Sequence, residues 1–155
     1  MIRKKDKVLL KELIEDSRLK IVDLAERTGL TRQSVYSKIH NLKKSGVSFT
    51  VDINPEHLGL NLKAYILIHA EPDSEVRKKL TEKIKKLREV SQLHYVLGRF
   101  DIIVEVVLKD RVQLKEVLKK FQSWPGVKKT ETFIVYDTVK FNPKDPFTGV
   151  LGQLK

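Results

Sequence analysis

The sequence has no cysteine, one methionine and one tryptophan among its 155 residues. A chain without cysteine forms neither disulfides nor thiolate metal sites, which fits a reducing compartment, and we expect a cytoplasmic protein. No apolar run reaches the roughly 18 residues of a membrane-spanning helix, so no membrane partner is expected. The four histidines show no metal-ligand spacing, and the sequence therefore predicts neither a bound metal nor a cofactor. They are His40, His57, His69 and His94.

Catalytic constellations are also missing. No Ser-His-Asp grouping, glycine-rich phosphate loop or pocket-like carboxylate pair stands out, so an enzyme is not expected. What the chain has instead is positive charge, with a net charge of +11. Residues 1–48 carry +6 and the remaining 107 residues +5, so the charge density is more than twice as high in the first third. A generally lysine-rich surface would also be basic, but this concentration favours an anionic partner such as nucleic acid.

Three short amphipathic patterns open the chain and predict helices. Asp6 is expected to cap the first helix. The second covers about residues 20–28 and ends at Gly29, and Thr31 caps the third. Two helices separated by a short turn that contains glycine are typical of a helix-turn-helix, whose second helix enters the DNA major groove. The first helix has the apolar stripe Leu9, Leu10, Leu13 and Ile14.

The stretch from Thr31 to Gly46 contains no acidic residue. Its narrow apolar stripe consists of Val35, Ile39 and Leu42, and the rest of its surface is polar. A solvated surface helix also has a polar outer face, but such faces usually carry Glu/Lys pairs. Arg and Gln suit base edges, and Ser, Thr, Tyr and Lys suit phosphates. The expected DNA contacts are Thr31, Arg32, Gln33, Ser34, Tyr36, Ser37, Lys38, His40, Lys43 and Lys44.

The remainder of the chain changes rhythm. Residues 47–53 alternate apolar and polar side chains and predict a strand, followed by a turn-rich stretch at 54–61. Next come a strand at 63–70, a helix at 73–89, strands at 91–97 and 100–108, a helix at 110–122 and a strand at 128–140. This β-α-β-β-α-β order predicts a ferredoxin-like fold. The expected domains are a helix-turn-helix at 1–48, a linker strand and hinge at 49–62, the ferredoxin-like domain at 63–141 and an extended C-terminal arm at 142–155.

A ferredoxin-like sheet is covered by helices on one face only, so its other face needs a partner. We expect oligomerisation through apolar strand residues on that face. These residues are Ile66, Ile68, Val104, Val106 and Ile134.

Several segments together resemble the leucine-responsive and asparagine-synthesis regulators, the Lrp/AsnC or feast/famine family. Each piece alone is weak, but their order and spacing over residues 6–141 are specific. They are the opening helix with Asp16-Ser17-Arg18, DLAERTGLT at 23–31, LKKSGV at 42–47, PEHLGL at 55–60, GRFD at 98–101 and PGVKKTET at 125–132.

The resemblance implies an α+β chain with an N-terminal winged-type helix-turn-helix and a C-terminal ferredoxin-like βαββαβ domain, often called RAM. It implies a sequence-specific, DNA-binding transcription regulator that binds double-stranded DNA as a homodimer. Dimers of such proteins assemble further, often to octamers. The segment like 47–53 often pairs with its partner equivalent, and amino acids or related metabolites bind between dimers as effectors.

The expected effector site combines the hairpin at Gly98, Arg99 and Asp101 with Thr130 and Thr132. A glycine lets a ligand approach, a carboxylate holds an amino group, and the threonine hydroxyls suit an α-carboxylate. The alternative is structural: Gly98 forms the turn, Asp101 caps it, and the threonines are ordinary strand residues. Both readings fit the sequence.

Two other functions remain open on the sequence. An architectural protein that wraps DNA would show little sequence preference and no effector. A metabolite-binding module with a vestigial DNA-binding domain would bind DNA only weakly, although the intact polar face at 32–44 argues against it. The lysine-rich face at residues 78–86 predicts a solvated helix surface, with a second contact to wrapped DNA as its alternative. The 33% charged content and absence of cysteine suit a heat-loving organism.

Overall fold

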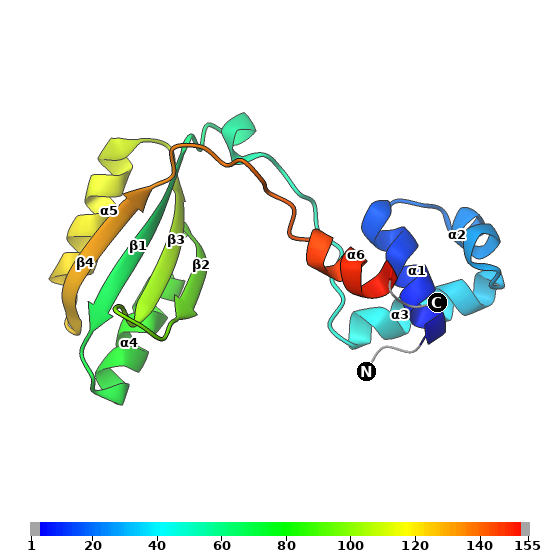
Figure 1. Cartoon of the computed structure of the whole chain (residues 1–155), viewed down its shortest axis with the longest axis horizontal. Helices are drawn as coiled ribbons and strands as arrows, with labels where there is room; N and C mark the ends of the chain where they lie inside the picture. Colours follow the sequence, from blue (N-terminus) through cyan, green and yellow to red (C-terminus); the bar gives the residue numbers. More distant parts are fainter. Residues whose placement is uncertain (1–3, 153–155) are drawn as a thin grey trace. The chain divides into compact units, whose positions relative to one another are not determined.

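The computed structural model describes residues 4–152, and their contacts form two compact units. Unit 1 contains the described residues up to Asp52 together with those from Lys140 onwards. Unit 2 runs from Ile53 to Val139. Figure 1 labels the helices and strands of both units. Within the described residues, no helix is long and apolar enough to cross a membrane.

Unit 1 is built around three helices, α1 (Lys4–Glu15), α2 (Ile21–Thr28) and α3 (Arg32–Lys44). Gly29 ends α2 in the left-handed conformation, with φ at 65°, where glycine carries no Cβ penalty. Thr31 begins α3, because its hydroxyl accepts a hydrogen bond from the Ser34 N–H at 3.2 Å. Both predicted helix ends are confirmed. The buried core between the helices consists of Leu9, Leu13, Leu24, Val35 and Leu42.

The predicted cap at Asp6 is wrong. Helix α1 begins at Lys4, so Asp6 lies within its first turn. Its carboxylate instead accepts a hydrogen bond from the Lys38 ammonium of α3. An acidic side chain in a first turn already interacts favourably with the helix dipole, and here it also finds a cation on the neighbouring helix. Asp6 therefore ties α1 to α3.

The predicted strand at 47–53 is also wrong. The segment is irregular and leads to a short 3-10 helix, η1 (Pro55–Leu58). Val47 is half-buried against the core, but the later side chains of the alternating pattern are exposed, with Val51 84% and Ile53 50% accessible to solvent. An alternating pattern forms a strand only when another strand pairs with it, and no strand of the described chain does so here.

The C-terminal segment is a helix rather than an extended arm. Helix α6 (Asp145–Gly152) packs against α1 within unit 1. Proline is tolerated in a first helical turn, which accommodates Pro146. Phe147, Val150 and Leu151 follow at i, i+3 and i+4 and so share one helix face. These three side chains gave the segment a helical period that its prolines and glycines concealed.

Unit 2 has the predicted βαββαβ order, so the expected ferredoxin-like fold is confirmed. Its sheet has the order β2-β3-β1-β4, with every neighbouring pair antiparallel. Figure 1 shows both helices on the same side of this sheet. The elements are β1 (Leu62–Ala70), α4 (Ser74–Lys85), β2 (Val90–Tyr95), β3 (Ile102–Leu108), α5 (Arg111–Ser123) and β4 (Val127–Ile134).

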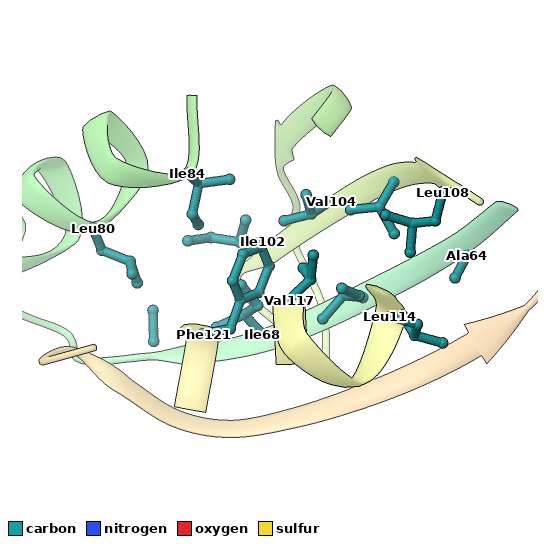
Figure 2. Packing of buried hydrophobic residues seen from close by; sticks show 13 residues of the cluster. Ala64, Ile68, Leu80, Ile84, Ile102, Val104, Leu108, Leu114, Val117 and Phe121 are labelled. Atoms are coloured by element: carbon teal, nitrogen blue, oxygen red, sulfur yellow. The ribbon is translucent and has the colours of Figure 1, made fainter. Parts of the chain in front are cut away.

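The core of unit 2 lies between the sheet and its helices, as Figure 2 shows. It includes four of the residues expected on the uncovered face, Ile66, Ile68, Val104 and Val106, which are fully buried. That part of the oligomerisation prediction is wrong. The alternation of strand side chains shows which residues share a face, but not which face the helices cover. The uncovered face instead carries the intervening residues of the strands. Its apolar members are Tyr65, Leu67, Ile103, Val107 and Phe133.

Two residues at the start of β4 set the spacing of the layers. Gly126 has a φ of 92°, and a Cβ added there would lie 2.6 Å from Val76 Cγ1 of α4. Only glycine therefore lets the chain pass so close to α4. Nearby, the ring of Trp124 stacks on Phe121 with centroids 5.3 Å apart and lies 6.0 Å from the Lys83 ammonium.

Candidate nucleic-acid interface and ligand-binding domain

Helix α3 presents a polar face to solvent while its apolar stripe is buried. Val35 is fully buried and Leu42 is 4% exposed, whereas the Tyr36 side chain is 67% exposed. No acidic residue occurs in α3, so its outer face is a surface of hydrogen-bond donors and positive charge. The exposed members of the predicted DNA-contact set are Thr31, Arg32, Gln33, Tyr36, Ser37, His40, Lys43 and Lys44.

Three of the ten predicted contact residues also have structural roles. Thr31 and Ser34 form the N-cap, and their hydroxyl oxygens lie 2.8 Å apart. Lys38 is only partly exposed and pairs with Asp6 of α1. The sequence signal for this pair was the acidic residue in the first turn of α1, which had been assigned to capping. The cap defines the start of α3, and the ion pair joins α3 to α1.

Lys43 lies near an aromatic ring that follows the helix. Its ammonium is 5.4 Å from the centroid of Phe49, a distance that allows a cation–π interaction. This contact joins the end of α3 to the irregular segment at 47–53. It leaves Lys43 at the exposed surface beside Lys44.

In unit 2, the hairpin between β2 and β3 is organised by Asp101. Its Oδ2 accepts a hydrogen bond from the Ala70 N–H at 2.9 Å and lies 2.9 Å from His69 Nδ1. The Arg77 guanidinium is 3.6 Å from the other carboxylate oxygen. The Ala70 N–H first, then His69, lower the pKa of Asp101 below its usual value. The carboxylate is therefore held ionised and connects three segments.

The remaining hairpin residues are more open. Gly98 has a φ of 147°, which suits glycine, and a Cβ there would meet no atom within 4 Å. Leu97 is fully exposed, and the Arg99 guanidinium lies 5.7 Å from the Phe100 ring. The hairpin thus combines a fixed carboxylate with an accessible turn.

The partners of the Asp101 carboxylate are Ala70, His69 and Arg77, and neither predicted threonine is among them. Thr130 pairs with Ile68, so its side chain shares the helix-covered face, and the Gln122 amide donates to its hydroxyl at 3.4 Å. His69, the neighbour of Asp101, pairs with Lys129 on the uncovered face. Within one chain, no contact that the structure describes joins Asp101 to either threonine.

A buried polar cluster on the uncovered face was missed by the sequence analysis. Glu105 is 8% exposed and accepts hydrogen bonds from the Tyr65 hydroxyl at 2.7 Å and the Ser91 hydroxyl at 2.6 Å. Burial raises the pKa of Glu105, but the bonds from Ser91 and Tyr65 outweigh it and leave the pKa below its usual value. The hydrogen bond between Tyr65 and Glu105 also raises the pKa of Tyr65. The glutamate inside an apolar strand was its only sequence signal.

The chain combines a helix-turn-helix, whose recognition helix is exposed and basic, with a ferredoxin-like unit. This combination defines a DNA-binding regulator with a separate sheet domain. Two family models match the chain, one over each of these two parts. The Lrp/AsnC ligand binding domain matches residues 63–145, and a winged helix-turn-helix DNA-binding domain matches residues 2–47. The chain belongs to the Lrp/AsnC family of transcription regulators.

Individual relatives support this assignment. A Pyrococcus furiosus HTH-type transcriptional regulator is 32% identical over 144 residues, covering 90% of this chain and 96% of the relative. The HTH-type regulator FL11 of the same organism is 33% identical over 134 residues, covering 84% and 86%. A Neisseria meningitidis transcriptional regulator, solved as a complex with L-Met, has the same fold, with a TM-score of 0.87 at 23% identity and coverage of 97% and 99%.

Proposed function

We propose that this regulator binds operator DNA through the exposed face of α3 and that an amino acid or related metabolite alters its assembly or its DNA affinity. The protein acts in the cytoplasm as a regulator and not as an enzyme. The observation that carries the proposal is the acid-free outer face of α3, held in place by the Thr31 cap and by Asp6. Arg32 and Gln33 read base edges at the start of the helix, and the lysines at its end neutralise phosphates.

The protein reads its operator as a homodimer or a larger assembly of dimers. Because a two-fold dimer presents two equal recognition helices, its site is palindromic. The uncovered sheet face supplies the association surface, with Tyr65, Leu67 and Phe133 around the satisfied Glu105 cluster. An apolar surface with a few hydrogen-bonded polar groups resembles the core of a protein interface.

The effector site is proposed at the hairpin around Asp101. The L-Met complex of the Neisseria meningitidis relative supports an amino acid as the ligand class. The Asp101 carboxylate is already ionised and can attract an ammonium group, and Gly98 leaves open space beside it. Since no described contact joins Thr130 or Thr132 to Asp101, we propose that they contribute to this site from a neighbouring subunit.

The proposal is tested by titrating a labelled duplex from the protein's own upstream region at about 150 mM salt, with and without the twenty amino acids. A scrambled duplex of the same composition is the reference. We expect the upstream fragment to bind at least roughly 10³-fold more tightly, and the amino acids to change that affinity. Dividing the pool then identifies the effector.

Variants locate the contact. Gln33→Ala is expected to weaken operator binding by roughly 5- to 100-fold and to reduce discrimination between the two duplexes. Lys44→Gln is expected to weaken binding to both duplexes and to reduce the salt dependence. Lys119→Gln, an exposed lysine on α5, is the matched control. Equal binding of both duplexes, unchanged by Gln33→Ala and by amino acids, would instead establish an architectural protein.

A further inference from the structure

Unit 1 contains a cavity of about 710 Å³ that the helix-turn-helix function does not use. One wall is the face of α1 with Leu10 and Ile14, a second is the segment with Val47 and Phe49, and a third is α6 with Phe147. Cavities of roughly 300–1,000 Å³ hold small molecules in proteins. The size and the apolar walls suit a ligand with a hydrocarbon body.

The polar groups at the cavity have one sign of charge. Lys7 of α1 and Lys144, which directly precedes α6, both line it. The described residues that line the cavity include no aspartate or glutamate. Among the described residues, no acidic side chain forms an ion pair with Lys7 or Lys144. The hydroxyls of Ser17 and Thr50 add neutral hydrogen-bond donors. Two unpaired cations beside an apolar space favour an anion attached to an apolar body.

We propose that this cavity is a binding site for an aliphatic carboxylate of medium chain length, separate from the ligand-binding domain. The hydrocarbon chain lies among Leu10, Ile14 and Phe147, and the carboxylate lies between Lys7 and Lys144. The site discriminates against an α-ammonium group, because two lysines repel it and no described lining residue is a carboxylate to hold it. It therefore differs in chemistry from an amino-acid site.

The cavity is connected to the DNA-binding face through its walls. Leu13 lines the cavity and belongs to the buried core with Val35 of α3. Val47 lines it as well and packs on the same core. A ligand would hold α6 against α1. It would thereby stabilise α1, whose Asp6 pairs with Lys38 of α3. Occupancy is thus linked to the stability of the recognition helix.

The direct test is isothermal titration calorimetry of the full chain without DNA, using three eight-carbon probes. Octanoate is expected to bind saturably at one site per chain. Octanamide, which lacks the charge, and 2-aminooctanoate, which adds the ammonium, are each expected to bind about tenfold more weakly. Because no DNA is present, this outcome is independent of operator recognition.

Variants assign the binding to the cavity. Val150→Trp fills the space from α6, where the native side chain is 64% exposed, and is expected to abolish octanoate binding with the fold retained. Lys7→Gln and Lys144→Gln are each expected to weaken octanoate binding by roughly threefold to fivefold. Lys115→Gln, an exposed lysine on α5, is the control and leaves binding unchanged.

Results of three kinds would overturn the proposal. The first is equal binding of octanoate and octanamide, which would leave the lysines without a role. The second is octanoate binding that Val150→Trp does not affect, or tighter binding of 2-aminooctanoate, which would place the ligand elsewhere. The third is no saturable binding of octanoate. If the Val150→Trp chain then also sediments as a smaller species, the cavity is a contact between two copies of the chain.

Discussion

At the scale of single residues, Asp101 shows how one carboxylate organises a hairpin. Its side chain accepts the Ala70 N–H and contacts His69, while its own N–H donates to the Ile68 carbonyl at 3.1 Å. Its carbonyl accepts the Val96 N–H at 2.9 Å. Asp101 therefore joins the end of β1 to the end of β2.

This arrangement predicts a pH-dependent stability. Because the folded-state pKa of Asp101 is lowered, its contribution is fully present above the ordinary carboxyl pKa of about 4 and is lost as the pH falls through the lowered value. Asp101→Asn is expected to lower the free energy of unfolding by about 1 kcal/mol at pH 7. The difference from the native protein should shrink below about pH 4, as measured by urea unfolding across pH.

Asp137→Asn, at an exposed position of unit 2, is the matched control and should change stability little at any pH. A deficit of Asp101→Asn that stays constant from pH 7 to acid would show that the charge is not what stabilises the hairpin.

The sequence could identify Asp101 as important but not choose its role. The GRFD pattern marked the hairpin, yet the three partners of the carboxylate come from β1 and α4, far away in the chain. Thr130 and Thr132 illustrate the same limit, since period two showed that they share a face but not which face. The polar cluster around Glu105 could not be predicted from the sequence, because Tyr65 and Ser91 lie on two other strands.

At the scale of elements, the start of α3 depends on one side chain. The Thr31 hydroxyl satisfies the Ser34 N–H, one of the donors that every helix leaves free at its N-terminus. Arg32 and Gln33 follow directly, so the cap also fixes the two residues proposed to read bases. A local bond thus carries part of the geometry of recognition.

Thr31→Ala is expected to lower the stability of unit 1 by about 1 kcal/mol and to weaken operator binding several-fold. Thermal unfolding followed by circular dichroism measures the first effect, and a duplex titration measures the second. Thr31→Ser keeps the hydroxyl and should restore both. If the serine variant behaves like the alanine variant, the hydroxyl is not the group that matters.

The elements also show where a sequence pattern suffices. Repeating apolar positions located α4 and α5 because each packs its own stripe on the sheet. The segment 47–53 has a clear alternating pattern, but a strand also requires a neighbour, which no local pattern contains. Helix α6 has a helical apolar pattern that the sequence analysis missed, because Pro146 and Gly149 suggested an irregular segment. Its contact with α1 stabilises this helix.

At the scale of the whole molecule, the association we propose uses the uncovered face of the sheet. Leu67 and Ile103 pair across β1 and β3 near the centre of that face, and Tyr65 pairs with Phe133 beside them. The fully buried strand residues named from the sequence cannot contribute, because they already pack under the helices. The proposed interface therefore uses the opposite set of side chains.

Leu67→Glu is expected to raise the dissociation constant of the dimer by roughly 100-fold, because it places a charge at the centre of an apolar interface. Sedimentation velocity over a concentration series measures this change. Val112→Glu, at a side chain 68% exposed on α5, is the control and should leave association unchanged. If Leu67→Glu associates like the native chain, the uncovered face is not the dimer surface.

The single tryptophan has a practical consequence for studying the two units. Trp124 is partly buried and stacks on Phe121 of the core of unit 2, and unit 1 contains no tryptophan. Its fluorescence is therefore an intrinsic optical reporter of one unit in the unmodified chain. Heating curves recorded by tryptophan emission and by a whole-chain signal would separate if the two units melt independently, which resolves their folding without cutting the protein.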